Sequence, residues 1–236
     1  MGSILDQVMT AQQLSHLSEF NPAQTVERIL EVLSEREQEI LKMRHGLAGF
    51  KKKTLEEIGR QYSITRERVR QIENSALKKI IKNFDQNFLK QIEDIANAIL
   101  NEHGGMMSEE NLIKELLVVP GATAENKAAI NFVLNQLLNH RFHFVKESKK
   151  VYSFWKTPEA SIDFFDKVID DIRQLIHEHK DTVILEDLIK KITQANFFSS
   201  NDDLNDKMVV NFLDITKKIE NNPYEEWGLA EWPSIT

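Results

Sequence analysis

The chain of 236 residues contains no cysteine. This absence excludes disulfides, thiolate zinc sites and cysteine nucleophiles. No apolar run approaches the length that spans a bilayer, and no signal-peptide core follows the start. None of the eight glycines belongs to a P-loop or a dinucleotide-binding fingerprint. We therefore expect a cytoplasmic protein with no membrane segment, no cofactor and no small-molecule substrate.

Catalytic and metal-binding patterns are also missing. The seven histidines form no ligand spacing, and His177-Glu178-His179 places its two imidazoles on different faces of a helix. The acidic run at 201–206 lacks the glycine and the terminal glutamate of an EF-hand loop, so helix capping is the better interpretation. We predict that the chain is not an enzyme and holds no metal.

The charges are unevenly distributed. The formal net charge is −7, yet residues 51–82 carry 10 Lys and Arg against 4 Asp and Glu. Residues 83–236 carry 16 against 26. A basic segment in an acidic chain is typical of a local nucleic-acid site, because phosphates must be neutralised there. The acidic remainder favours a protein partner over a second nucleic-acid site.

The basic segment contains a helix whose exposed face can read DNA bases. Thr65 is a good N-cap for this helix. Helical spacing places one apolar set inward, Ile64, Val69, Ile72 and Ala76, and one polar set outward, Arg66, Glu67, Arg70, Gln71 and Asn74. Arg pairs with guanine, Gln with adenine, and Glu accepts from cytosine in the major groove. The alternative interpretation is a solvated helix face laced with salt bridges.

Two upstream helices make the DNA-reading interpretation stronger. Thr54 and Glu57 form a capping box that opens a helix from Leu55 to about Tyr62, in which Gly59 allows a neighbouring helix to approach closely. A turn of about three to four residues then leads to the next helix, which is the helix-turn-helix arrangement. Ser34 and Glu37 form another capping box, and that helix stops near Gly46. We expect a compact four-helix unit at 21–84.

Four blocks of this unit resemble region 4 of the sigma-70 family of bacterial sigma factors, the module that binds the promoter −35 element. The blocks are Leu33-Ser34-x-Arg36-Glu37, Met43-Arg44-x-Gly46-Leu47, Thr54 to Gly59, and Ile64 to Glu73. The resemblance implies base contacts from Arg66, Glu67, Arg70 and Gln71. It implies phosphate contacts from Arg36, Arg44 and the backbone near Leu55. We also expect phosphate contacts from the lysines before the motif, for which a solvated loop is the open alternative, and from the start of the reading helix. The expected phosphate set is Arg36, Arg44, Lys51, Lys52, Lys53, Leu55, Thr65 and Arg68. Ser75 stands where the family usually has a basic residue.

The remainder does not resemble a sigma factor. Residues 1–20 are expected to form an arm, and no aromatic-bearing module that melts the −10 element precedes the unit. We therefore expect no promoter opening by this protein alone, although the sequence can be part of a longer natural protein.

Residues 85–157 have the element order of a winged helix: helix, strand, helix, helix, hairpin. The strand is expected at Met106-Met107, and the two β-prone runs lie at 142–146 and 151–155. Residues 158–236 echo this order. A helix from Ile162 to His179 precedes Thr182-Val183-Ile184, and 224–232 is the expected wing. We predict two diverged copies of one winged-helix unit.

The first copy resembles the HARE-HTH winged-helix domains, one of which occurs in the delta subunit of Gram-positive RNA polymerase. Gly104-Gly105-Met106-Met107 and the aromatic wing ending in Trp155 carry this resemblance, and the wing around Trp227 and Trp232 extends it to the second copy. Wing packing is the simpler role for these tryptophans.

The prediction is a mainly α chain: an arm at 1–20, a helix-turn-helix domain at 21–84, and winged helices at 85–157 and 158–236. We expect a transcription factor that binds double-stranded DNA at a −35-like element, with the winged helices contacting protein or RNA polymerase core. The leading alternative is a delta-like polymerase accessory protein whose helix-turn-helix docks on protein. A DNA-modifying enzyme is a distant third, because the chain lacks a catalytic domain.

Overall fold

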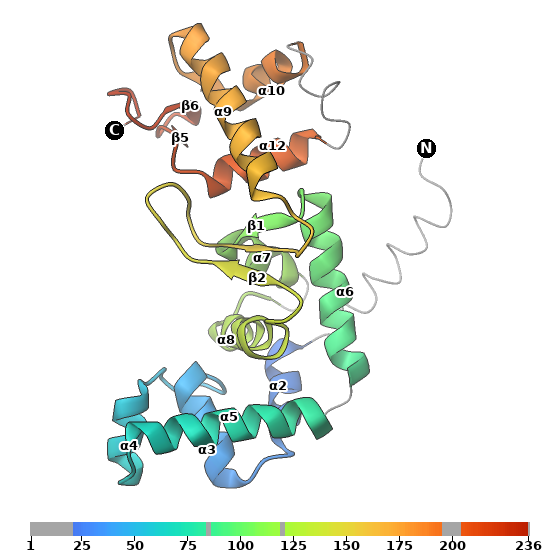
Figure 1. Cartoon of the computed structure of the whole chain (residues 1–236), viewed down its shortest axis with the longest axis vertical. Coiled ribbons are helices and arrows are strands. Elements are labelled where there is room, and N and C mark those ends of the chain that lie inside the picture. Colours follow the sequence, from blue (N-terminus) through green and yellow to red (C-terminus); the bar gives the residue numbers. More distant parts are fainter. Residues whose placement is uncertain (1–20, 84–85, 119–120, 195–203, 236) are drawn as a thin grey trace. The chain divides into compact units, whose positions relative to one another are not determined.

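The computed structural model describes residues 21–83, 86–118, 121–194 and 204–235 (Figure 1). These residues are mainly helical, with two small antiparallel sheets. The described residues divide into two compact units, one within 21–96 and 113–140 and the other within 97–112 and 141–235. Each unit is described by itself. The predicted arm at 1–20 lies outside the described residues. Within the described ranges, every helix is too short or too polar to cross a membrane.

The first unit begins with the four predicted helices: α2 (Pro22–Leu30), α3 (Glu35–His45), α4 (Leu55–Tyr62) and α5 (Arg66–Asn83). Their boundaries follow from local hydrogen bonds. The Glu37 carboxylate accepts hydrogen bonds from the backbone N–H and the hydroxyl of Ser34. The Glu57 carboxylate accepts the Thr54 backbone N–H at 2.7 Å, and the Thr54 hydroxyl accepts the Glu57 backbone N–H at 3.2 Å. Gly46 ends α3 in the left-handed region with φ 71°. The predicted caps are therefore confirmed.

A small apolar core holds α3, α4 and α5 together. Its buried members are Ile40, Met43, Ile58 and Val69, with Leu55, Tyr62, Ile64 and Ile72 packed around them. Gly59 lies at the closest approach of the motif, because a Cβ there would lie 2.7 Å from the Ile64 carbonyl oxygen. The expected close approach at this glycine is thus present, although the neighbour is the turn that leads into α5 rather than a helix.

The first unit also contains α8 (Ala124–Phe132), which continues as one π-helical turn, Val133–Leu137. Sequence spacing predicts one helix over this stretch, but it cannot predict the wider turn. Helix α8 packs against α2, and the π-helical turn packs against α5. Two further helices, α6 (Gln86–Glu102) and α7 (Glu109–Leu116), contribute residues to both units.

The second unit contains two sheets of the same topology. Strands β1 (Met106–Ser108), β2 (His143–Val145) and β3 (Phe154–Lys156) lie in the order β1-β3-β2. Helices α9 (Ile162–His179), α10 (Leu185–Gln194) and α12 (Asp206–Ile215) accompany β4 (Val183–Ile184), β5 (Ile219–Asn221) and β6 (Glu226–Leu229), in the order β4-β6-β5. In both sheets the last strand is central and antiparallel to its neighbours. The predicted winged-helix element order is confirmed twice.

The strands are shorter than predicted, and the second hairpin begins earlier. Strands β2 (His143–Val145) and β3 (Phe154–Lys156) are shorter than the predicted runs 142–146 and 151–155, and β3 ends one residue beyond the second run. Strand β5 precedes the predicted wing at 224–232. Tyr224 lies in the hairpin turn, where Glu225 has a positive φ of 62°. The wing is predicted from its aromatic residues, whereas the backbone register pairs Ile219 with Leu229.

The two copies share a core in this unit. Met106 and Phe154 of the first copy pack in one cluster with Phe165, Ile169 and Phe212 of the second. The Asn211 side-chain amide on α12 donates to the Met106 carbonyl at 2.5 Å and to the His103 carbonyl at 3.0 Å. Trp155 and Trp227 are buried, as their packing role predicts.

Gly59→Ala should destabilise the first unit by about 1–3 kcal/mol, because the added methyl group meets backbone atoms that can move only by shifting the turn. Arg60→Ala, at the next and exposed position of α4, should change the free energy of unfolding by less than about 0.5 kcal/mol. Urea unfolding of both variants measures the difference. Equal stabilities would refute the steric role of Gly59.

Candidate nucleic-acid interface

The N-terminal half of α5 presents the predicted base-reading side chains on one surface. Arg66, Glu67, Arg70 and Gln71 are all exposed, whereas Val69 is fully buried and fixes the opposite side of the helix. The Thr65 hydroxyl accepts the Arg68 backbone N–H at 3.1 Å, so the helix begins where the sequence predicts. The structure thus places these four side chains together at one helix end.

Two of the four form an ion pair with each other. Arg70 donates to both oxygens of Glu67, with Nε–Oε2 at 2.8 Å and Nη2–Oε1 at 2.7 Å. This hydrogen bonding lowers the pKa of Glu67 and raises the pKa of Arg70. The fork orients the Arg70 guanidinium, which must share or exchange this partner to reach a guanine edge. In parallel, Arg68 Nη1 donates to Gln71 Oε1 at 3.2 Å.

The residues predicted to contact phosphates lie beside the motif, but they differ in exposure and in hydrogen bonding. Lys51 and Lys52 are exposed, whereas Lys53 is half-buried and donates from Nζ to Gln61 Oε1 at 2.6 Å. Leu55 is the first residue of α4, and its side chain packs against the core. Only its backbone N–H is available to a phosphate, which is the chemistry expected at a helix N-terminus.

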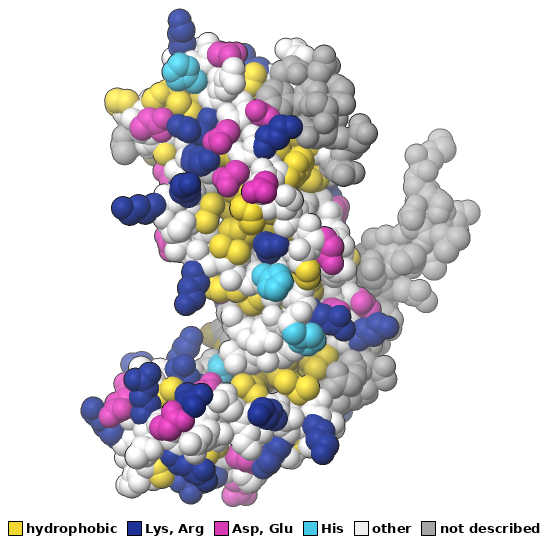
Figure 2. Space-filling model, viewed as in Figure 1, with side chains coloured by type: hydrophobic (Ala, Val, Ile, Leu, Met, Phe, Trp, Pro, Cys, Tyr) yellow, Lys and Arg dark blue, Asp and Glu magenta, His cyan; other side chains and the backbone are white. Residues whose placement is uncertain are grey.

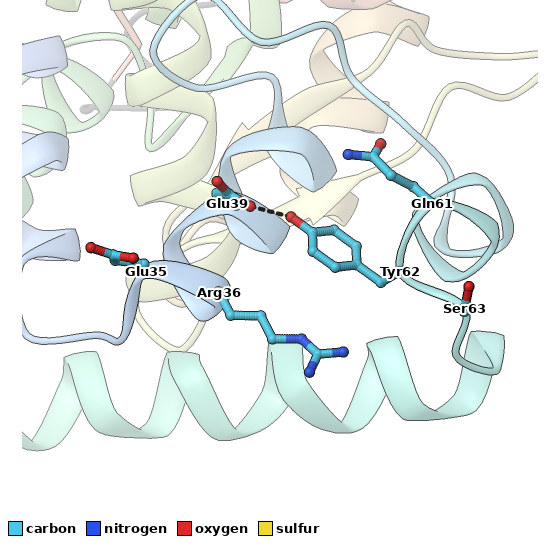
Figure 3. A pocket seen from close by; sticks show the side chains of 6 residues that line it. All are labelled: Glu35, Arg36, Glu39, Gln61, Tyr62 and Ser63. Carbon is cyan, nitrogen blue, oxygen red and sulfur yellow. Dashed lines mark hydrogen bonds between the residues drawn. The ribbon is translucent and has the colours of Figure 1, made fainter.

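Arg36 lies in an open groove between α3 and the end of α4. The groove has a volume of about 530 Å³ and is lined by Glu35, Arg36, Glu39, Gln61, Tyr62 and Ser63 (Figure 3). The Arg36 guanidinium carbon lies 5.5 Å from the centre of the Tyr62 ring, a cation–π contact. The Tyr62 hydroxyl donates to Glu39. Burial and this acidic neighbour raise the pKa of Tyr62 to about 12, so the hydroxyl remains a donor at neutral pH.

The Arg44 side chain is only partly exposed and already has partners within the protein. Its Nε lies 3.5 Å from Glu73 Oε1, and its Nη1 donates to the Lys53 carbonyl at 3.4 Å. Nε2 of the adjacent His45 lies 3.1 Å from the same Glu73 oxygen. Burial acts to raise the pKa of Glu73, but His45 and Arg44 outweigh it, and the net shift is downward. Arg44 therefore has a structural partner, and 31% of its side chain remains accessible.

Sequence reasoning missed Glu73, Glu39 and Tyr62 as residues that position the predicted contacts. The i, i+3 spacing of Glu67 and Arg70 was a usable signal for the ion pair. No local pattern links Glu73 to Arg44, since they lie on different helices 29 positions apart.

The molecular surface around the motif is basic. Figure 2 shows Lys and Arg side chains gathered over the region of α3, α4 and α5, with fewer acidic side chains between them. A basic surface around an exposed helix end is the electrostatic pattern of a DNA-binding module.

Comparison with known proteins identifies the same segment. Residues 29–82 match the family model described as Sigma-70, region 4. The RNA polymerase sigma factor SigA of Nostoc sp. (strain PCC 7120 / SAG 25.82 / UTEX 2576) is 51% identical over 55 residues, which are 23% of this chain and 14% of that protein. RpoD of Helicobacter pylori (strain ATCC 700392 / 26695) is 39% identical over 80 residues, 34% of this chain and 12% of that protein.

SigA of Lactococcus lactis subsp. cremoris is 31% identical over 80 residues, 34% of this chain and 22% of that protein. The matched part thus spans less than a quarter of each of these relatives. No solved structure matches the chain. The matches support a sigma-70 region 4 domain in the first unit of this protein.

Glu73→Gln should destabilise the protein by about 1–3 kcal/mol at pH 7, because Arg44 and His45 lose their charged partner. The folded pKa of Glu73 lies below its ordinary value of 4.5. The stability it contributes is therefore fully present above that value and is lost as pH falls through the lowered folded pKa.

Urea unfolding at pH 7 and at pH 3.5, roughly one pKa unit below the ordinary value, measures this dependence. The difference between wild type and Glu73→Gln should shrink at the lower pH. Glu56→Gln is a matched control, since Glu56 forms only an exposed pair with Arg60 and should cost less than about 1 kcal/mol at either pH. A Glu73 effect equal to that of Glu56 would refute the assignment.

Proposed function

We propose that this protein is a DNA-binding transcription factor that reads a −35-like promoter element through the N-terminal half of α5. The observation that carries the proposal is the exposed row of Arg66, Glu67, Arg70 and Gln71 on the second helix of a helix-turn-helix. The match of residues 29–82 to sigma-70 region 4 supports it. The relatives are named RNA polymerase sigma factors, so polymerase is the expected protein partner.

Each residue has a role in this proposal. Arg66 and Arg70 pair with guanine edges and Gln71 with an adenine, while Glu67 accepts from a cytosine or orients Arg70. Arg36, Arg44, Lys51, Lys52, Lys53, Arg68 and the N–H groups at the starts of α4 and α5, near Leu55 and Thr65, contact phosphates and set the register. This role is non-enzymatic and belongs in the cytoplasm.

The winged helices supply protein contacts in this proposal. Residues 83–236 carry 16 Lys and Arg against 26 Asp and Glu, and this acidic balance disfavours a second DNA site. The resemblance of the first copy to HARE-HTH domains suggests RNA polymerase as the partner. The domain boundaries at 84 and 157 belong to the same proposal.

The first test is fluorescence anisotropy with a −35-like duplex and a scrambled duplex of equal length at two salt concentrations. Tighter binding to the −35-like duplex is expected. Equal binding that weakens with salt would reduce the function to phosphate attraction or point to a different target sequence. Absence of binding to both, with salt-tolerant capture of core polymerase, would favour the delta-like accessory role instead.

Arg70→Ala should cost about 1–3 kcal/mol of binding free energy and relax the preference at one base position. Lys190→Ala is a matched control, because Lys190 forms an exposed i, i+3 pair with Asp187 on α10 of the second unit. The control should leave affinity unchanged. Unchanged base preference in Arg70→Ala would show that α5 is not the reading helix.

Lys51→Ala and Lys52→Ala should instead weaken binding to all sequences alike. Each should also lower the slope of log K against log salt by about 1, because one phosphate contact is removed. Anisotropy titrations over a salt series measure the slope. A loss of affinity restricted to the −35-like duplex would contradict the phosphate role.

A further inference from the structure

Helix α8 supplies a hydrogen bond to the start of α2, about a hundred residues earlier in the chain. The first N–H groups of a helix have no partner within it. In α2, Asn21 accepts the Gln24 N–H at 3.1 Å, and the Ala23 N–H donates to Asn126 Oδ1 at 3.2 Å. Asn126 is only 5% exposed, and its Nδ2 donates to the Gly121 carbonyl at 2.9 Å. Thus α8 completes the N-terminal cap of α2.

A second contact joins α8 to the helix-turn-helix. The ring of Phe132, at the end of α8, meets the ring of His45 edge-on, with the ring centres 5.0 Å apart and the planes at 61°. His45 ends α3 and also faces Glu73 of α5. The π-helical turn that follows packs against α5, and its residues Val133, Leu134 and Leu137 are buried.

Helix α8 has no exposed face suited to reading DNA. In the helix–strand–helix–helix–hairpin order, α7 and α8 correspond to the two helices of a helix-turn-helix, of which the second normally reads the major groove. From Ala129 to Leu138 every side chain is buried or half-buried. The exposed charges of α8 are Glu125 and Lys127, which are two residues apart and point to different sides.

We infer that α8 and the π-helical turn form an internal docking element for the region 4 domain, not a DNA-reading helix. The docked element, residues 124–137, then packs as one body with the region 4 domain at 21–83, although it belongs to the first winged-helix copy in the sequence. The base-reading row of α5 stays exposed while α8 is docked. In the first winged-helix copy, the helix at the recognition-helix position therefore packs against another part of the same chain.

The docking is tested without DNA in the full chain, which contains no cysteine of its own. Gln24→Cys and Lys127→Cys introduce thiols at exposed positions next to the Ala23–Asn126 hydrogen bond. A short bis-maleimide should join them rapidly within one molecule. The control pair combines Gln24→Cys with Arg60→Cys, an exposed position on α4. Equal cross-linking of both pairs would overturn the docking.

A second measurement tests the cap itself. Asn126→Asp keeps an acceptor for the Ala23 N–H, whereas Asn126→Leu removes it. Hydrogen exchange at the Ala23 amide should accelerate by about tenfold in the Leu variant and far less in the Asp variant. Equal exchange rates in the two variants would show that Asn126 does not cap α2.

The third measurement, of DNA binding, rests on the proposed function. Lys127→Ala should leave affinity for the −35-like duplex unchanged, whereas Arg70→Ala reduces it about tenfold or more. A Lys127→Ala loss equal to that of Arg70→Ala would make α8 a DNA-reading helix and overturn the inference. If Arg70→Ala has no effect, the proposed function fails, while the cross-linking result still decides the docking.

Discussion

The close approach at Gly59 is the constraint on which the DNA-reading surface depends. The Ile64 carbonyl lies where a side chain on residue 59 would begin, so the chain can turn from α4 into α5 within three residues. Ser63, the C-cap of α4, begins the turn in the left-handed region with φ 53°. Burial of Val69 and Ile58 in the same small core then fixes the rotation of α5 about its axis. That rotation, and nothing within the basic residues themselves, directs Arg66 and Arg70 to solvent.

Acidic side chains hold several of the basic ones in this module. Glu67 orients Arg70, Glu73 lies against Arg44, and Glu37 accepts from Lys79 at 2.6 Å. The exposed pairs contribute little to stability, but they restrict the rotamers of long side chains before any ligand is met. A guanidinium held by two hydrogen bonds loses less conformational entropy on binding than a free one. The same pairs must be partly replaced by base or phosphate contacts, so the gain in affinity is smaller than the number of arginines suggests.

Most of the helix-turn-helix was predictable, since its signals are local. Thr54 with Glu57, Ser34 with Glu37, and the spacing of apolar residues define where α3, α4 and α5 begin and which side is buried. The winged-helix order was predictable for the same reason, but strand lengths were not. Pairing of Ile219 with Leu229 depends on backbone register across a turn, and aromatic residues such as Tyr224 misplace it. The pair between Arg44 and Glu73 needs a known angle between two helices, which no one-dimensional pattern contains.

Asn126 illustrates what local patterns leave out. In the sequence it is an ordinary polar residue in the first turn of a helix, where Asn is common. In the fold it is buried and satisfies a donor at the start of α2. A buried amide with both ends engaged specifies one docking geometry, because any shift leaves a polar group without a partner. Apolar contacts at Phe132 and Leu137 supply the burial, and they tolerate sliding far better. The direction in which α8 lies on α2 is therefore set by a polar residue, while apolar contacts of Phe132 with His45 and of the π-helical turn with α5 supply buried area.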